Sequence, residues 1–442
     1  MFGSLMTSRR FAPLFWCQFC SALNDNFLKN ALVMLILFGL GGAGGVGQSG
    51  AVLVTLAGIV FIAPFFILSA LGGDLADRYD KAFVATRIKL AEIPVAGLAA
   101  VGFYLHSVPI LFITLGLFGI ISALFGPVKY GLLPEKLQTA ELPAGNALVE
   151  GATFLAILIG TIAGGLAVSE AKSPELVVGV ILALAVASWL SARAIPFSGP
   201  SAPDIVVARN PWPATIAVLR ELRADSRLWG GAHVVSWFWV VGSVALSLLP
   251  ALVRDVVGGS EGVVTLCLTV FVAGIASGSL LAAQQSHGTP NLTLVPRGAM
   301  MIGAASLALA LVALTATAAT PAIGPVALIG TVSGIALLVS LFALAVAGGL
   351  YIVPAFAAVQ AWSPPDRRAR VIAGVNVMNA AYMVVGGGLV AALQAAGLGV
   401  GLLFALLGLL TFGFMASVLR AWFANIALVG ERALHTEVEK AA

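Results

Sequence analysis

Long apolar segments alternate with short polar loops along most of this 442-residue chain. The hydrocarbon core of a bilayer is about 30 Å thick, so a helix needs roughly 20 mostly apolar residues to cross it. The pattern therefore predicts an all-α membrane protein with twelve transmembrane helices. The predicted spans lie near residues 12–40, 49–71, 82–105, 109–127, 146–168, 176–195, 229–251, 261–283, 294–316, 323–350, 369–393 and 399–424.

A polar stretch containing "SGPSAPD" separates the first six predicted spans from the last six. The two groups share a pattern, because "AGNALVEG" in the first resembles "AGVNVMNA" in the second, and such parallel repeats are common in alternating-access transporters. We predict four parts: a six-helix bundle over 1–195, a cytoplasmic linker with a short amphipathic helix over 196–228, a second six-helix bundle over 229–424 and a cytoplasmic tail over 425–442.

Lysine and arginine are concentrated in alternate loops of this map, as they are in the cytoplasmic loops of membrane proteins. If both termini are cytoplasmic, only Lys172 and Arg254 remain on the outer side, and Lys29 lies within a span. Membrane orientation then explains the net charge of +4 better than nucleic-acid binding does. We expect both termini in the cytoplasm and no nucleic-acid partner.

The composition indicates a membrane protein, and the motifs of an enzyme are missing from the sequence. The chain is 60% hydrophobic and only 10% charged, whereas soluble domains are about a quarter charged. Cys17 and Cys20 form a C-x-x-C pair, but no second pair or nearby histidine accompanies them. None of the four histidines begins the H-x-x-x-x-D pattern of an acyltransferase. We therefore expect no catalytic residue, no metal and no cofactor.

Between the second and third predicted spans lies the segment "GGDLADRYDKAFVATRIK". Its glycine permits close helix approach, and its second aspartate can meet a helix N-terminus or an arginine of the other half. We predict a latch for one conformation, made of Gly73, Asp77, Arg78 and Lys81. The alternative is that these charges only set membrane orientation. The spacing resembles the G-x-L-A-D-R-x-G-[RK] signature of the major facilitator superfamily, with Asp80 where that family prefers glycine, and the resemblance implies that fold.

The first predicted span carries five polar residues in its middle: Asn24, Asp25, Asn26, Lys29 and Asn30. Ionisable groups within a membrane cost about 2.5–3.5 kcal/mol each on insertion scales, and they usually face a cavity or a partner. Asp25 and Lys29 are four residues apart and can pair with each other. Pairing leaves the three asparagines unexplained, whereas the polar lining of a substrate cavity explains all five.

Further polar residues can converge on that cavity from other spans: Lys129, Tyr130, Glu150, Asn376 and Asn379. Most of the remaining interior positions are alanine, glycine, leucine and valine. A cavity with few charges and broad apolar walls suits an amphipathic substrate better than a sugar or an ion.

Four separated segments together resemble the lysophospholipid transporter family: "FWCQFCSALNDNFLKNAL" (15–32), "FGPVKYGLLPEKL" (125–137), "GNALVEGATFLAILIGTIAGG" (145–165) and "GGLYIVPAFAAVQ" (348–360). The resemblance implies a flippase that moves lysophospholipids across the bacterial inner membrane by alternating access. It implies head-group or gating roles for Asp25, Asn26 and Lys129.

The family occurs alone or fused ahead of an acyltransferase and an acyl-ligase, so the implied partners are the lysophospholipid, the membrane lipids and a separate acyltransferase that acts on the transported lipid. We expect a monomer. The sequence departs from the family in two ways. The seventh predicted span lacks an arginine that some members carry, and Lys29 is a feature of the fused relatives. One cation can replace the other, which leaves the preferred head group open.

An alternative function keeps the fold and changes the cargo. A proton-coupled exporter of amphipathic drugs would use Asp25 or Glu150 as its proton carrier. Proton flux that does not depend on lipid would distinguish this exporter from a lipid flippase.

The charge distribution makes a direct prediction about topology. A reporter fused at Ala442 or within residues 196–227 should report the cytoplasm, and one within 170–174 should report the periplasm. A cytoplasmic signal near Lys172 would contradict the twelve-span map.

Overall fold

The computed structural model describes residues 2–36, 47–169, 174–207, 210–286 and 289–429. The described residues form helices and no strand, apart from an isolated bridge between Gly259 and Ile323. They divide into two compact units. The first unit comprises Met1–Val218 and Pro364–Ala380, and the second comprises Leu219–Ser363 and Ala381–Ala442.

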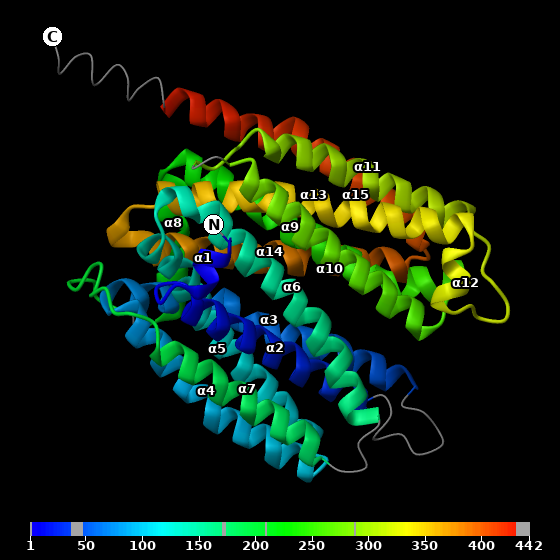
Figure 1. Cartoon of the computed structure of the whole chain (residues 1–442), viewed down its shortest axis with the longest axis horizontal. Coiled ribbons are helices and arrows are strands. Elements are labelled where there is room, and N and C mark those ends of the chain that lie inside the picture. The colour runs from blue at the N-terminus through cyan, green and yellow to red at the C-terminus, as the bar shows by residue number, and fades with distance from the viewer. Residues whose placement is uncertain (1, 37–46, 170–173, 208–209, 287–288, 430–442) are drawn as a thin grey trace. The chain divides into compact units, whose positions relative to one another are not determined.

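The first unit contains one short helix and six long helices before the linker. The long helices run side by side in Figure 1. Helix α2 packs against α6 and α7, α3 packs against α5, and α4 packs against α5 and α7. The helices are α1 (Phe2–Thr7), α2 (Ala12–Met34), α3 (Gly47–Arg78), α4 (Lys81–Tyr104), α5 (Val108–Lys136), α6 (Leu142–Ser169) and α7 (Glu175–Arg193), with a 3-10 turn η2 (Thr139–Glu141) before α6.

The linker contains α8 (Pro211–Ala224), whose last residues belong to the second unit. In the second unit α13 packs against α9, α10 and α11, and α11 also packs against α15. Its helices are α9 (Ser226–Ala251), α10 (Glu261–Gln284), α11 (Leu294–Thr315), α12 (Pro325–Ile329), α13 (Val332–Trp362) and α15 (Val400–Phe414), with π turns η3 (Leu252–Val257) and η5 (Met415–Leu419).

Helix α14 (Arg368–Ala395), preceded by the 3-10 turn η4 (Pro365–Arg367), is shared between the units. Its first half, up to Ala380, belongs to the first unit, and its second half belongs to the second. The predicted second bundle, over 229–424, includes all of this helix, and that division of the chain remains a prediction.

Ten of the described helices are long and apolar enough to cross a membrane. Helices α2 and α4, at 23 and 24 residues, have the required length but are not among the ten. They carry the polar side chains of the candidate site, which lower their hydropathy. The count of twelve spans and the orientation of the termini remain predictions.

Several helices continue past the apolar runs that predicted them. The fourth predicted span ends at 127, whereas α5 continues to Lys136, so Lys129 lies inside the helix rather than after it. The tenth ends at 350, whereas α13 continues to Trp362. Tyr130 and Tyr351 in these extensions donate to buried acceptors on other helices, and a hydropathy rule cannot detect such partners.

Three lysines on the predicted cytoplasmic side are buried: Lys81, Lys89 and Lys136. Lys81 and Lys89 both lie in α4 with side chains that have no exposed surface. Each has a carboxylate partner, so neither contributes to the surface charge that orients a membrane protein. The remaining basic residues still support the predicted orientation.

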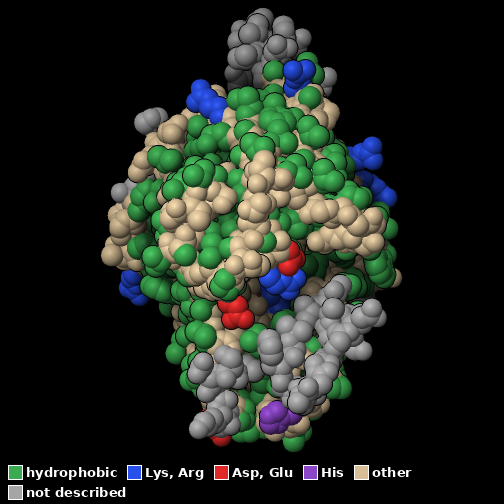
Figure 2. Space-filling model, turned by 90° about the vertical axis from the view of Figure 1, so that its right-hand side faces the viewer, with side chains coloured by type: hydrophobic (Ala, Val, Ile, Leu, Met, Phe, Trp, Pro, Cys, Tyr) green, Lys and Arg blue, Asp and Glu red, His purple; other side chains and the backbone are tan. Residues whose placement is uncertain are grey.

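The outer surface is rich in large apolar side chains, as Figure 2 shows for one face. Ile113 is 59% exposed, Leu311 is 62% exposed and Leu409 is 61% exposed, and all three lie on candidate spans. Exposure of this kind is unfavourable in water and favourable in hydrocarbon. The surface therefore fits a protein embedded in lipid.

Glycine permits the closest helix contact in the first unit. A Cβ atom at Gly164 of α6 would meet the carbonyl oxygen of Phe27 in α2, whereas one at the next residue, Gly165, would find no atom nearer than the Met34 Cγ at 3.9 Å. Small residues let membrane helices approach in this way.

This pair of neighbouring glycines tests the packing. Gly164→Ala should destabilise the protein by about 1–3 kcal/mol because the α2 backbone must move. Gly165→Ala should leave stability unchanged or slightly raised, since alanine favours helix. Apparent melting temperatures of the purified proteins in detergent measure both. Equal effects of the two changes would contradict the α2–α6 contact.

Candidate functional site

A buried polar cluster joins α2 to α4, and we call it the α2–α4 cluster: Ser21, Asn24, Lys89 and Glu92. The Lys89 ammonium donates to the Ser21 hydroxyl at 2.5 Å and forms an ion pair with Glu92 at 2.8 Å. Asn24 donates to the second oxygen of Glu92 at 3.1 Å and to the backbone of Ile181 at 3.2 Å. Side chains of this cluster are fully or almost fully buried.

Lys89 and Glu92 were not predicted as site residues from the sequence. A signal was present, because an acid and a base three residues apart lay within the predicted span 82–105. The lysine also lies 4.2 Å from the Phe125 ring centre on α5. The pair brings Asn24 of α2, Phe125 of α5 and the backbone of α7 around one buried charge.

Asp25 has a different partner from the one its spacing suggests. Its Oδ2 accepts a hydrogen bond from Ser122 of α5 at 2.6 Å. Lys29 instead donates to Asn26 at 3.3 Å, and the described residues show no ion pair between Asp25 and Lys29. Structural pairing of these two residues therefore does not account for the polarity of α2.

Asn26 and Asn30 satisfy much of their hydrogen bonding within α2. Asn26 donates to the Ala22 carbonyl at 2.8 Å, and Asn30 donates to the Asn26 carbonyl at 2.8 Å. Asn30 also donates to Thr161 of α6 at 3.2 Å. These two residues therefore contribute to the contact between α2 and α6 and are only half-buried.

A second buried acid lies between α5 and α6. Glu150 is 1% exposed and accepts a hydrogen bond from the Tyr130 hydroxyl at 3.0 Å. The Lys129 ammonium lies 4.5 Å from the Tyr130 ring centre. The structure thus brings Glu150 of α6 together with Tyr130 of α5, whose neighbour in sequence is Lys129.

Asn376 and Asn379 lie in the part of α14 that belongs to the first unit, and both are buried. The Asn376 amide covers Gly126 of α5, since a Cβ atom there would lie 2.7 Å from its Nδ2. Gly126 is one turn from Ser122 and one turn from Lys129. Asn376 therefore approaches the same face of α5 as the partner of Asp25.

Within the candidate site, three buried acceptor oxygens have no hydrogen-bond donor among the described residues: Asn24 Oδ1, Asp25 Oδ1 and Glu150 Oε2. Buried polar atoms are nearly always hydrogen-bonded, and an unmade bond costs about 1–3 kcal/mol. Such atoms fit a ligand or water that donates hydrogen bonds. Among the described residues no group of three or more His, Cys, Asp or Glu side chains could hold a metal ion.

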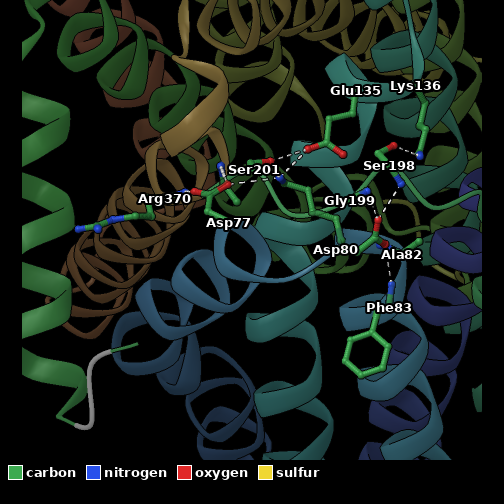
Figure 3. Close-up of polar contacts among 12 residues, drawn as sticks. Asp77, Asp80, Ala82, Phe83, Glu135, Lys136, Ser198, Gly199, Ser201 and Arg370 are labelled. Atoms are coloured by element: carbon green, nitrogen blue, oxygen red, sulfur yellow. Dashed lines mark hydrogen bonds and ion pairs between the residues drawn. The ribbon is translucent and has the colours of Figure 1, made fainter. Parts of the chain in front are cut away.

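Asp77 of the predicted latch lies at the first turn of α14, close to Arg370, as Figure 3 shows. The Asp77 carboxylate accepts the backbone N–H groups of Ala369 at 3.1 Å and Arg370 at 2.9 Å. These N–H groups have no partner within the helix, and the positive end of the helix dipole favours an anion there. Of the two partners that the sequence allowed, Asp77 therefore takes the helix N-terminus, while Arg370 lies 3.5 Å from Asp74.

Lys81 completes this group, which we call the latch cluster: Asp77, Lys81, Glu135 and Ser201. Its ammonium lies 3.3 Å from Asp77, 2.5 Å from Glu135 and 2.6 Å from the Ser201 hydroxyl. The lysine side chain has no exposed surface. One buried cation therefore connects α3, α4, α5 and the linker.

Gly73 and Arg78 have separate positions. A Cβ atom at Gly73 would lie 2.9–3.0 Å from Ala373, Ala369 and Arg370, so this glycine permits α3 to approach α14. The Arg78 guanidinium donates to the Ile205 carbonyl at 3.1 Å. Arg78 thus holds the linker rather than α14.

The linker contacts were not predicted. Asp80 caps α4 through Ala82 and Phe83, and its other oxygen accepts the N–H groups of Ser198 at 2.7 Å and Gly199 at 2.6 Å (Figure 3). Gly199 has a φ of +86°, which glycine adopts without strain. The aspartate at the position where the family signature prefers glycine therefore has a role of its own, because it fixes the linker.

Comparison with known proteins gives a consistent result. The chain matches the family described as "Major Facilitator Superfamily" over residues 14–337. The lysophospholipid transporter LplT of Serratia proteamaculans is 28% identical over 299 residues, which are 64% of this chain and 67% of that protein. LplT of Yersinia enterocolitica is 28% identical over 286 residues, which are 63% of this chain and 66% of that protein. The aligned part therefore spans about two thirds of these relatives.

Solved structures share the fold. The human organic anion transporter MFSD10 has a TM-score of 0.71 at 16% identity, covering 94% of this chain and 99% of that one. A bacterial homologue of the iron transporter ferroportin, in an outward-facing state, has a TM-score of 0.65 at 16% identity, covering 95% and 99%. The family match extends over well more than half of the chain, and ten described helices can cross a membrane. The protein is a multi-pass membrane transporter, and the chain belongs to the major facilitator superfamily.

Proposed function

We propose that this transporter moves lysophospholipids between the leaflets of the bacterial inner membrane by alternating access. Two relatives that align over about two thirds of their length are named lysophospholipid transporters. The transported lipid would be the substrate of a separate acyltransferase, and the transporter would act as a monomer.

The observation that carries this proposal is the set of buried acceptors without donors. Asn24 Oδ1, Asp25 Oδ1 and Glu150 Oε2 lack hydrogen bonds within the described residues. A lysophospholipid head group supplies the missing donors, because its free glycerol hydroxyl donates a hydrogen bond and an ethanolamine ammonium donates three. A hydrocarbon or a simple anion supplies none.

The basic residues complement these acceptors. Lys29 follows Asp25 by four residues, and Lys129 directly precedes Tyr130. Both lysines are only half-buried. We assign them to the phosphate, with Asp25 and Glu150 facing the amine or hydroxyl. Tyr130 orients Glu150 through its hydrogen bond. The remaining polar residues of the proposed lining are Asn26, Asn30, Asn376 and Asn379.

The latch cluster supplies the conformational part of the mechanism. Asp77 is held by the first turn of α14 and by Lys81, and such a contact can form in one access state and break in another. We propose that Gly73, Asp77, Arg78 and Lys81 stabilise one state in this way. Lys81 keeps Glu135 as a carboxylate partner when the Asp77 charge is removed, so we expect the fold to be retained while the contact with α14 weakens.

Uptake of lysophosphatidylethanolamine by spheroplasts, with and without the protein, tests the proposed cargo. We expect faster uptake when the protein is present. Proton flux that is independent of lysophospholipid, without lipid uptake, would instead favour the amphipathic-drug exporter.

Asp25 gives the most direct test of the head-group site. Asp25→Asn keeps the shape and the hydrogen bond from Ser122, but it removes the charge. A hydrogen bond to a charged group is worth about 1.5–3 kcal/mol, so uptake should fall roughly tenfold to a hundredfold at normal abundance. Asp255→Asn, an exposed acid paired with Arg254, is the matched control and should leave uptake unchanged. Normal uptake by the Asp25 variant would remove this residue from the proposed site.

Asp77 tests the latch. Asp77→Asn keeps a hydrogen-bond acceptor at α14 but loses the interaction of a charge with the helix dipole, which is worth about 0.3–2 kcal/mol. We expect slower uptake, with membrane insertion and lipid binding retained. Asp204→Asn, in the exposed part of the linker, serves as the control. A variant that loses abundance and uptake in parallel would show that Asp77 has only a structural role.

A further inference from the structure

Helix α8 presents two opposite faces. Ala214, Val218 and Leu222 follow one another every four residues and are buried. On the opposite side, Trp212 is 59% exposed and Ile216 is 56% exposed. A 3.6-residue period places Arg220 and Arg223 on the same exposed stripe as these two residues.

The buried face fixes the helix against the first unit. Ala214 and Val218 pack with Ala70 of α3 and Ala373 of α14. The Thr215 hydroxyl donates to the Phe66 carbonyl at 3.3 Å. The exposed stripe therefore faces away from the protein in a defined direction.

The contact points set the depth of α8. Phe66 and Ala70 lie within the candidate span Leu56–Arg78, at 12 and 8 residues from its end. At 1.5 Å per residue they lie about 18 and 12 Å from that end of the helix. Ala373 likewise lies within the span Pro365–Ala395. A helix docked beside spans at these points borders the membrane rather than open water.

We propose that α8 lies in the membrane interface, with Trp212 and Ile216 among the lipid chains and with Arg220 and Arg223 binding the phosphates of anionic phospholipids. Tryptophan prefers the head-group region, and arginine is attracted to an anionic lipid surface. The two exposed arginines are the only charged side chains on this stripe within the described part of α8. The proposal depends on the membrane location of the protein and not on its cargo.

The depth of α8 in the membrane can be measured with spin labels in a variant that lacks the three native cysteines. Labels at Trp212→Cys and Ile216→Cys should be more accessible to oxygen than to a water-soluble nickel chelate in vesicles that contain phosphatidylglycerol. Leu409→Cys, 61% exposed on a candidate span, is the lipid reference. Asp204→Cys, on the exposed linker, is the water reference. Labels at 212 and 216 that match the water reference would overturn the proposal.

Binding of lipid phosphates by Arg220 and Arg223 can be tested by native mass spectrometry of the purified full chain with phosphatidylglycerol and phosphatidylcholine. Arg220→Gln with Arg223→Gln should lower the bound phosphatidylglycerol at least threefold and leave bound phosphatidylcholine unchanged. Lysine at both positions should retain binding, which separates charge from the contact of Arg223 with the Trp229 ring. Arg254→Gln with Arg420→Gln removes the same charge from exposed positions elsewhere. An unchanged lipid count, or an equal loss in this control, would refute phosphate binding by α8.

Discussion

The cost of placing charge inside a low-dielectric interior governs the candidate site and the helices around it. A buried ion that lost its partner would cost several kcal/mol, so each buried charge must be matched by hydrogen bonds from neighbouring helices. Lys89 illustrates this, because Glu92 and Ser21 surround its ammonium. The α2–α4 cluster therefore fixes the position of α2, and with it the residues that we propose to contact the substrate.

The same requirement explains why α2 and α4 differ from the other long helices. Their polar residues reduce hydropathy below that of the ten candidate spans. Neighbouring helices compensate, since α2 packs against α6 and α7 and α4 packs against α5 and α7. The lysophospholipid transport that we propose would need such helices, because purely apolar walls would offer a polar head group no hydrogen bonds. In that proposal, buried acceptors without donors, such as Asp25 Oδ1, bind the head group.

The latch cluster, for which we propose a conformational role, depends on the same chemistry. A carboxylate at a helix N-terminus is stabilised by N–H groups that have no other partner. The contact of Asp77 with α14 is therefore favourable and consists of two hydrogen bonds. Lys81 links this contact to Glu135 and to the linker. Helix α14 continues from the first unit into the second, and we propose that the contact at its first turn is reversible.

The sequence by itself determined the class of protein and its family. The lengths of the apolar segments, the loop signature and the motif around Asp25 are local patterns that can be read along the chain. The sequence also allowed Asp77 two kinds of partner, a helix N-terminus or an arginine, without deciding between them. Only the tertiary structure decided the partners. Asp25 bonds to Ser122, 97 residues away, rather than to Lys29 on its own helical face. Lys89 forms a buried ion pair with Glu92 and is not a charge of a cytoplasmic loop. Sequence spacing reports which residues can share one helix face, whereas the packing of separate helices decides which of them meet.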